Sequence, residues 1–355
     1  MRWKFLLSAF AVCAIMATGM SVNKAEAADK VYKWRAVSHQ MVGTSRFVHT
    51  IVPFCEMVKA ASGGRLIIEP YGAGVLFPVS ETFDAVRDNM VQMAMCWSGY
   101  WGGKHPLFPL ASGRPGGPIT SFSECYYRSE QLAPIMERLY AKFGVTYLGS
   151  FDFNPSEILV SAKAIRSFDD FKGKNIRAGG LAGPFYSKIG VSVVLLTPPE
   201  IYQALQLGTV DGAEYNDWLV NKEMAFDEVA KYVIEPAVHT DAADDKDLIV
   251  NPDAWKELPD DLKAIVMACR DMARYKSAVA YGAGNDLAKQ QWIDGGAEVI
   301  QLPAEDVARL RKAAAELLVD MAGKDPITKE YVDGYAKVLH DLGYIQEAAD
   351  LGYTK

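Results

Sequence analysis

The sequence has few of the signatures by which an enzyme is recognised. Its 355 residues contain no G-x-S-x-G elbow, no H-E-x-x-H pair, no P-loop and no G-x-G-x-x-G after the first expected strand. Catalysis by a serine, a histidine and an aspartate would need the fold alone to bring them together, an alternative that the sequence leaves open. The five histidines are scattered along the chain: His39, His49, His105, His239 and His340.

Cysteine is also scarce. Cys13 lies in the N-terminal apolar run, and the other four cysteines show no C-x-x-C spacing and no neighbouring histidine pair. We interpret them as small buried residues. An oxidising compartment would permit a disulfide, but the spacing assigns no pairing among Cys55, Cys96, Cys125 and Cys269.

Positive charge and long apolar runs are limited as well. Arg2 and Lys4 precede an apolar run over residues 5–16, and Ala25-Glu26-Ala27 has the form of a signal-peptidase site, so residues 1–27 are expected to be a cleaved secretory leader. Removing that leader takes away three basic and one acidic side chains and moves the formal net charge from -7 to -9. An acidic exported protein is a poor candidate for binding nucleic acid or an anionic membrane. No later segment approaches the length of a membrane-spanning helix.

The remaining chain is long enough for two cores of ordinary size, since half of its residues are hydrophobic. The most informative segment is 174–214, which predicts one βαβαβ unit. Strands are expected at 174–178, 191–196 and 209–214, with helices at 182–189 and 197–208 between them. A similar alternation at 32–97 predicts a second sheet of the same build.

Two charged residues of the first unit are expected at one sheet edge. Arg177 ends its strand before Gly179-Gly180, and Glu214 ends the last strand, so both should lie where open parallel sheets bind ligands. The guanidinium of Arg177 can present two parallel donors to a carboxylate or sulfonate. A structural ion pair with the neighbouring domain is the alternative for Arg177.

Aromatic residues follow the strand ends in both halves. Tyr215 and Trp218 come directly after Glu214, in a segment suited to a cleft wall. Tyr100 and Trp101 follow the last strand of the first half, where they either line a small pocket or pack beneath a loop.

Several longer motifs together resemble the periplasmic solute-binding proteins of TRAP transporters, the DctP-type family. They are GAGVL at 72–76, FKGKNIRAGG at 171–180, PPEIYQALQLGTVDGAEYND at 198–217 and NPDAWKELPDDLK at 251–263. The resemblance covers the whole mature chain. It implies an α/β fold of two domains with a ligand cleft between them and one long helix, expected at 259–293, that spans both. Domain I is then 28–154 plus about 243–282, and domain II is 155–242 plus about 283–355.

The resemblance also implies a function. Such proteins bind an organic acid in the periplasm and deliver it to a membrane permease of small and large subunits, and Arg177 takes the position of the arginine that pairs with the substrate carboxylate. The sequence leaves open whether the protein forms a homodimer. The alternatives are a periplasmic enzyme acting on a small acid and a sensor subunit for a membrane kinase.

Within the family the chain is most similar to the branch that binds 2-oxo acids and lactate, where a metal ion bridges protein and substrate. Glu214 and Tyr215 match two of that branch's metal ligands. Its glutamine is replaced in the crossing at 151–163 by Ser156 or Glu157, so the implied ligand set for Na⁺ or Ca²⁺ is Glu214, Tyr215, Ser156 and Glu157. Asn154 and Ser156 of this crossing are also expected to contact the substrate. The replacement leaves a sulfonate such as isethionate, or a larger aromatic acid, as alternative ligands.

Overall fold

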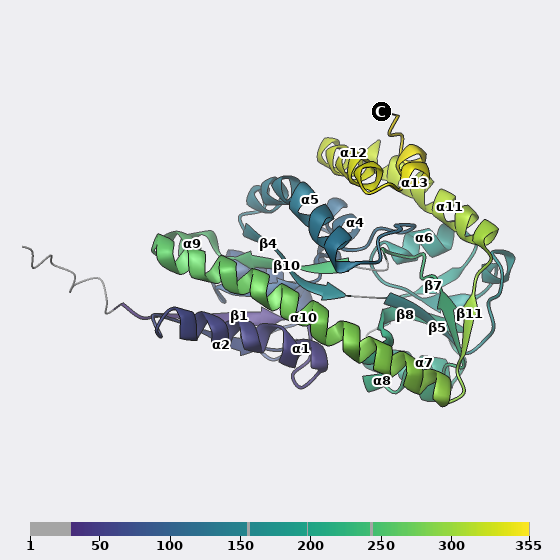
Figure 1. Ribbon diagram of the computed structural model, residues 1–355, viewed down its shortest axis with the longest axis horizontal. Coiled ribbons are helices and arrows are strands. Elements are labelled where there is room, and N and C mark those ends of the chain that lie inside the picture. Colours follow the sequence, from purple (N-terminus) through teal and green to yellow (C-terminus); the bar gives the residue numbers. More distant parts are fainter. Residues whose placement is uncertain (1–29, 155–156, 197, 242–243, 355) are drawn as a thin grey trace, which may run out of the picture.

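The computed structural model describes residues 30–154, 157–196, 198–241 and 244–354. Two mixed sheets lie side by side, each with helices on both faces (Figure 1). This confirms the expected α/β class with two sheets.

The first sheet has the strand order β2-β1-β3-β10-β4. Strands β1, β2 and β3 are parallel, whereas β10 returns from the second half of the chain and pairs antiparallel with β3 and β4. Two apolar clusters cover its two faces. Its strands are β1 (Tyr32–Ser38), β2 (Leu66–Tyr71), β3 (Met93–Cys96), β4 (Thr146–Asn154) and β10 (Asp244–Val250). The associated helices are α1 (Ser45–His49), α2 (Ile51–Ala61), η1 (Val79–Glu81), α3 (Thr82–Arg87), η2 (Ser98–Trp101), α4 (Leu107–Ser112), α5 (Phe122–Lys142) and α9 (Pro252–Glu257).

The second sheet has the order β11-β9-β5-β8-β6-β7. Its strands are β5 (Glu157–Ser161), β6 (Asn175–Arg177), β7 (Ser192–Val194), β8 (Gly212–Asp217), β9 (Tyr232–Glu235) and β11 (Glu298–Gln301). Its helices are η3 (Asp169–Phe171), α6 (Ala182–Lys188), α7 (Pro198–Gln206), α8 (Trp218–Glu223), η4 (Phe226–Glu228) and α11 (Ala304–Ala322). The apolar run at 191–196 predicted a strand buried on both faces, but β7 is an edge strand, and Leu195 beyond it is 72% exposed.

One long helix connects the two halves. Helix α10 (Asp260–Asp294) packs against α2 and β4 of the first half and against α8 of the second, and it runs across the molecule in Figure 1. Its buried side chains recur along its whole length, from Leu262 to Trp292. Within the described residues, no helix is both long enough and apolar enough to cross a bilayer.

The C-terminal helices return to the first half. Helices α12 (Pro326–Asp341) and α13 (Ile345–Asp350) share an apolar cluster with α5, as their proximity in Figure 1 suggests. The sequence analysis assigned residues 283–355 to the domain of the second sheet, whereas α12 and α13 pack with the first half. The domain limits themselves stay a prediction. The four cysteines of the described residues are buried, and none of them forms a disulfide bond.

Candidate functional site

A cavity of about 880 Å³ lies between the two sheets, and both contribute to its walls. The first half supplies the loop 39–44, the turn around Gly74, and residues that follow β3. The second half supplies the ends of β6 and β8, the start of α6, and the crossing that follows β9. Its charged and aromatic lining residues are His39, Trp97, Tyr100, Glu157, Arg177, Glu214, Tyr215, Glu223, His239 and Lys246.

Arg177 is held at the cavity wall by the second sheet. It ends β6, which lies between β7 and β8, and it is 8% exposed. Its Nε donates to the Leu196 carbonyl at 3.2 Å, and its Nη1 donates to the Glu214 carbonyl and to Glu214 Oε2, the latter at 3.1 Å. Among the described residues, Nη2 has no hydrogen-bond partner. The guanidinium is therefore fixed on one side and retains a donor for a ligand.

Glu214 lies beside Arg177 because of the strand register. Arg177 is paired with Ala213 in the parallel β6–β8 ladder, so the next residue of β8 meets the guanidinium. The sequence predicted that Glu214 ends its strand. Strand β8 instead continues to Asp217, so Glu214 lies within it. Its Oε2 also accepts the Gly179 N–H at 3.0 Å, and its Oε1 has no partner among the described residues. Burial raises the pKa of the Glu214 carboxyl, and the charge of Arg177 opposes that rise.

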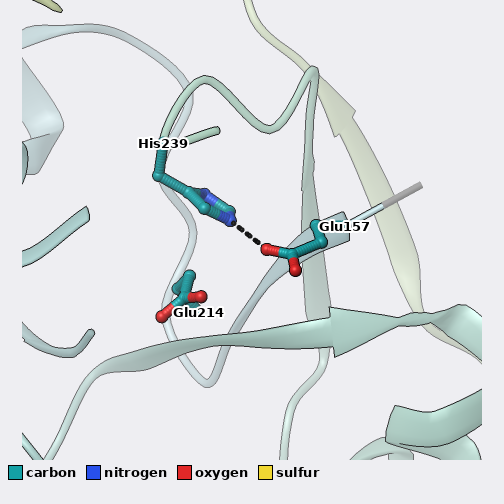
Figure 2. A group of neighbouring side chains, drawn as sticks. All are labelled: Glu157, Glu214 and His239. Atoms are coloured by element: carbon teal, nitrogen blue, oxygen red, sulfur yellow. Dashed lines mark ion pairs between the residues drawn. The ribbon is translucent and has the colours of Figure 1, made fainter. Parts of the chain in front are cut away.

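Two further groups complete an acidic cluster with Glu214 (Figure 2). The carboxylate oxygens of Glu157 and Glu214 and a ring nitrogen of His239 lie within 4.8 Å of one another. Glu157 begins β5, and His239 comes from the crossing after β9; its Nε2 lies 3.5 Å from Glu157 Oε2. The imidazole is 1% exposed, and its Nδ1 is 2.9 Å from the Tyr186 hydroxyl.

Burial and the neighbouring positive groups act in opposite directions on the pKa of the Glu157 carboxyl. Burial would raise the pKa of its carboxyl, but interactions with His239 and with Lys246 across the cleft hold that pKa below its ordinary value. At His39, on the same wall as Lys246, burial and the nearby charge act in the same direction. Burial and the nearby ammonium lower the pKa of the His39 imidazole to about 3, so it is neutral.

Three aromatic rings lie near the guanidinium of Arg177 at the cavity wall. Trp97 and Tyr100 meet edge to face at 5.0 Å between ring centroids, and the Trp97 indole N–H donates to the Ser112 carbonyl at 3.2 Å. The Tyr215 ring lies 5.5 Å from the Arg177 guanidinium carbon. Burial raises the pKa of the Tyr100 hydroxyl, and the positive charges of Arg177 and Lys246 oppose that rise.

The other sequence-predicted site residues lie elsewhere. Trp101 and Trp218 are each 2% exposed and belong to the apolar cores of the two halves, where Trp218 packs edge to face on Trp292 at 5.8 Å. Neither tryptophan lines the cavity, so Trp101 follows the buried one of its two alternatives. The expectation for Trp218 was wrong, because helix α8 begins at Trp218 and turns its ring into the core. Ser156 lies outside the described residues, as does the side chain of Asn154.

The two walls of the cavity touch at several points. A Cβ built on Gly180 would lie 2.7 Å from the Trp97 ring, so the indole packs directly against the turn that follows β6. The Ser45 hydroxyl donates to the Glu223 carboxylate across the cleft. Closer to the crossing, the buried guanidinium of Arg46 pairs with Asp217 of the second half.

His239 and Lys246 were missed by the sequence reasoning. Both lie on or just after the second crossing between the sheets, between β9 and β10, whereas the resemblance implies ligands only in the first crossing, at 151–163. The available signal was a cluster of polar residues, His239, Thr240 and Asp241, at the end of a strand. Asp241 of this cluster is fully buried and pairs with Arg114 at 2.6 Å and Arg128 at 2.5 Å.

Comparison with known proteins places the chain among transport receptors. A relative from Nostoc sp., a monocarboxylate 2-oxoacid-binding periplasmic protein, is 26% identical over 319 residues, which cover 89% of this chain and 86% of that protein. Residues 37–325 match the profile of the bacterial extracellular solute-binding proteins, family 7.

Solved structures agree with this assignment. A TRAP transporter solute-binding protein from Bordetella bronchiseptica, solved with calcium and picolinate, superposes with a TM-score of 0.82 at 25% identity, covering 91% of this chain and 96% of that one. One from Colwellia psychrerythraea, with bound calcium and pyruvate, gives a TM-score of 0.80 at 24% identity over 90% and 98% of the two chains, a likeness of fold. The chain belongs to the DctP family, the bacterial extracellular solute-binding proteins of family 7.

Proposed function

We propose that this protein is the extracytoplasmic receptor of a TRAP transporter, which binds a small organic acid anion, a 2-oxo or hydroxy carboxylate, and delivers it to the membrane permease. The acid binds in the cavity between the two sheets. It enters while the halves are apart and is enclosed when they close, so the protein performs capture and release rather than chemistry.

The observation that carries the proposal is the geometry of Arg177. Its guanidinium is buried and held by three protein acceptors, which leaves Nη2 without a partner among the described residues at the cavity wall. A carboxylate at this position would receive a charge-assisted hydrogen bond from a buried guanidinium, and such bonds are stronger than those between neutral groups. The 2-oxoacid-binding relative from Nostoc sp. supports a monocarboxylate ligand.

The acidic cluster fits a bound cation. Glu214 and Glu157 face the position of an anionic ligand, and two carboxylates would repel that ligand unless a positive charge lies between them. Carboxylate oxygens are the ligands that Na⁺ and Ca²⁺ prefer, and the Bordetella protein holds calcium together with a carboxylate. We infer that Glu214 and Glu157 would hold such an ion, with His239 beside it. Its positive charge would offset the two carboxylates and so allow an anionic ligand to lie beside them.

Titration calorimetry of the purified protein with pyruvate, 2-oxobutyrate and lactate, in buffer that contains sodium and calcium, tests the proposal. Arg177→Lys should weaken binding by at least ~10-fold, about 1.4 kcal/mol, because a point charge cannot keep the Glu214 contacts and also reach the ligand.

Arg166→Lys is the matched control. Arg166 lies in the same half, is exposed, and pairs with Glu298 at 2.6 Å on the surface, so its replacement should leave the affinity unchanged. The proposal fails if neither these acids nor larger 2-oxo acids bind to the wild-type protein. It also fails if the Arg177 and Arg166 variants bind equally well.

A further inference from the structure

We propose that the ligand is an organic acid with an aromatic ring, an arylalkyl 2-oxo acid, rather than a three-carbon acid. This inference rests on the proposed function, because it takes the carboxylate of the ligand to lie at Arg177. The inference adds the chemical nature of the part of the ligand that points away from Arg177.

The size of the cavity is the first argument. Its volume is about 880 Å³. At ~30 Å³ for each water molecule, that space corresponds to roughly 30 waters. A three-carbon acid would displace only a few of them, so most of the apolar lining would stay wet. A ligand that removes this surface from water gains affinity in proportion to the area that it covers.

The cavity is not large merely because the two halves stand apart. The Trp97 ring of the first half packs on Gly180 of the second, and the Ser45 hydroxyl reaches the Glu223 carboxylate across the cleft. The walls therefore meet on more than one side while the space between them persists.

The second argument is the nature of the lining away from the charged cluster. It is mainly apolar, and part of it is openly accessible: Val42 is 63% exposed and Met41 is 39% exposed. Apolar surface gathered at one concave place commonly marks a binding site. The aliphatic residues that line the cavity are Met41, Val42, Val79, Leu181, Val220 and Met224.

The third argument is the arrangement of the rings. Trp97 and Tyr100 stand almost perpendicular, at 88°, so together they offer a face and an edge to a guest. Tyr100 is 45% exposed although it lies at the cavity wall, and Tyr215 lies next to Arg177 on the opposite wall. A ligand ring attached within a short reach of the carboxylate would lie between these side chains, in the edge-to-face or offset contacts that aromatic pairs prefer. An aliphatic chain would cover the same area without these contacts.

Calorimetry with phenylpyruvate, 4-methyl-2-oxopentanoate and pyruvate tests the inference on the wild-type protein. We expect phenylpyruvate to bind at least tenfold more tightly than pyruvate and more tightly than the branched aliphatic acid. Tyr100→Ala should lower the ratio of phenylpyruvate to pyruvate affinity at least threefold. The control Tyr275→Ala removes a tyrosine that is 58% exposed on α10, outside the cavity lining, and should leave that ratio unchanged.

The outcomes separate this inference from the function on which it rests. If none of the three acids binds, the proposed function itself fails. If pyruvate binds as tightly as phenylpyruvate, the function stands and the inference is overturned. Tightest binding of 4-methyl-2-oxopentanoate, or an equal effect of the Tyr100 and Tyr275 substitutions on the ratio, would overturn the role of the aromatic wall.

Discussion

Arg177 carries two tasks that can be separated by experiment. One side of its guanidinium neutralises Glu214 within the protein, and the other side is available to a ligand. Replacing Arg177 alone therefore changes both stability and binding. Replacing both Arg177 and Glu214 should restore the stability but not the binding.

The magnitudes follow from the burial of the pair. The side chains of Arg177 and Glu214 are each 10% exposed and 3.1 Å apart. Arg177→Met leaves a buried carboxylate and two backbone carbonyls without their donor, which typically costs about 3–5 kcal/mol of unfolding free energy. In the double variant Arg177→Met/Glu214→Gln no buried charge is left unpaired, so most of that loss should be recovered. Binding should stay weaker by roughly 10- to 150-fold in both variants, the equivalent of a lost charge-assisted hydrogen bond of about 1.5–3 kcal/mol.

Urea unfolding followed by tryptophan fluorescence gives the stability of each variant, and calorimetry gives its affinity for the acid that the wild-type protein binds. The control Arg166→Met removes an exposed arginine and should change neither value by much. A double variant that regained both stability and wild-type affinity would refute the reasoning, since Arg177 would then be only a structural partner of Glu214.

Four further predictions concern closure, the cation and pH. Gly180→Ala should weaken binding, because its Cβ would lie 2.7 Å from the Trp97 ring at a φ of +51°, which calorimetry would detect as a lower affinity. Small-angle scattering should show a smaller radius of gyration with ligand than without it, and equal curves at saturation would exclude closure. Chelation in choline buffer should lower the affinity, and sodium or calcium should restore it; no response to either ion would leave Glu214 as a direct acceptor for the ligand. Burial opposes the ionisation of Asp211, but Lys163 and the Asn175 N–H lower its pKa below 3.8, so its contribution to stability is present above that pH and is lost as pH falls through the lower folded pKa. Asp211→Asn should therefore lower the free energy of unfolding at neutral pH. In an acid titration of unfolding, this difference from the wild-type protein should shrink as the pH falls.

The sequence predicted that Arg177 and Glu214 lie close together, because their proximity depends only on local structure. Arg177 and Glu214 belong to strands of one βαβαβ unit, and a parallel register brings the two side chains together without help from the rest of the chain. The long helix was predicted at 259–293 and is found at Asp260–Asp294, since its apolar positions repeat over its whole length and Gly295 follows it.

The errors arose where distant segments decide the outcome. His239 joins the acidic cluster only because the chain crosses between the sheets a second time, and no periodic pattern indicates which side of a crossing faces a cleft. Trp218 looked like a cleft residue from its place after a strand. Its ring instead fills the core against Trp292, a residue 74 positions away in the sequence whose position depends on α10. The packing of α12 on α5 depends in the same way on contacts between remote helices.

A crystal structure of the protein with its bound acid tests the central claim most directly. The account predicts a carboxylate oxygen of the ligand at about 2.7–2.9 Å from Arg177 Nη2, with the Arg177–Glu214 pair intact. A carboxylate bound elsewhere in the cavity, for example at Lys246, with Arg177 touching only Glu214 and backbone carbonyls, would contradict it.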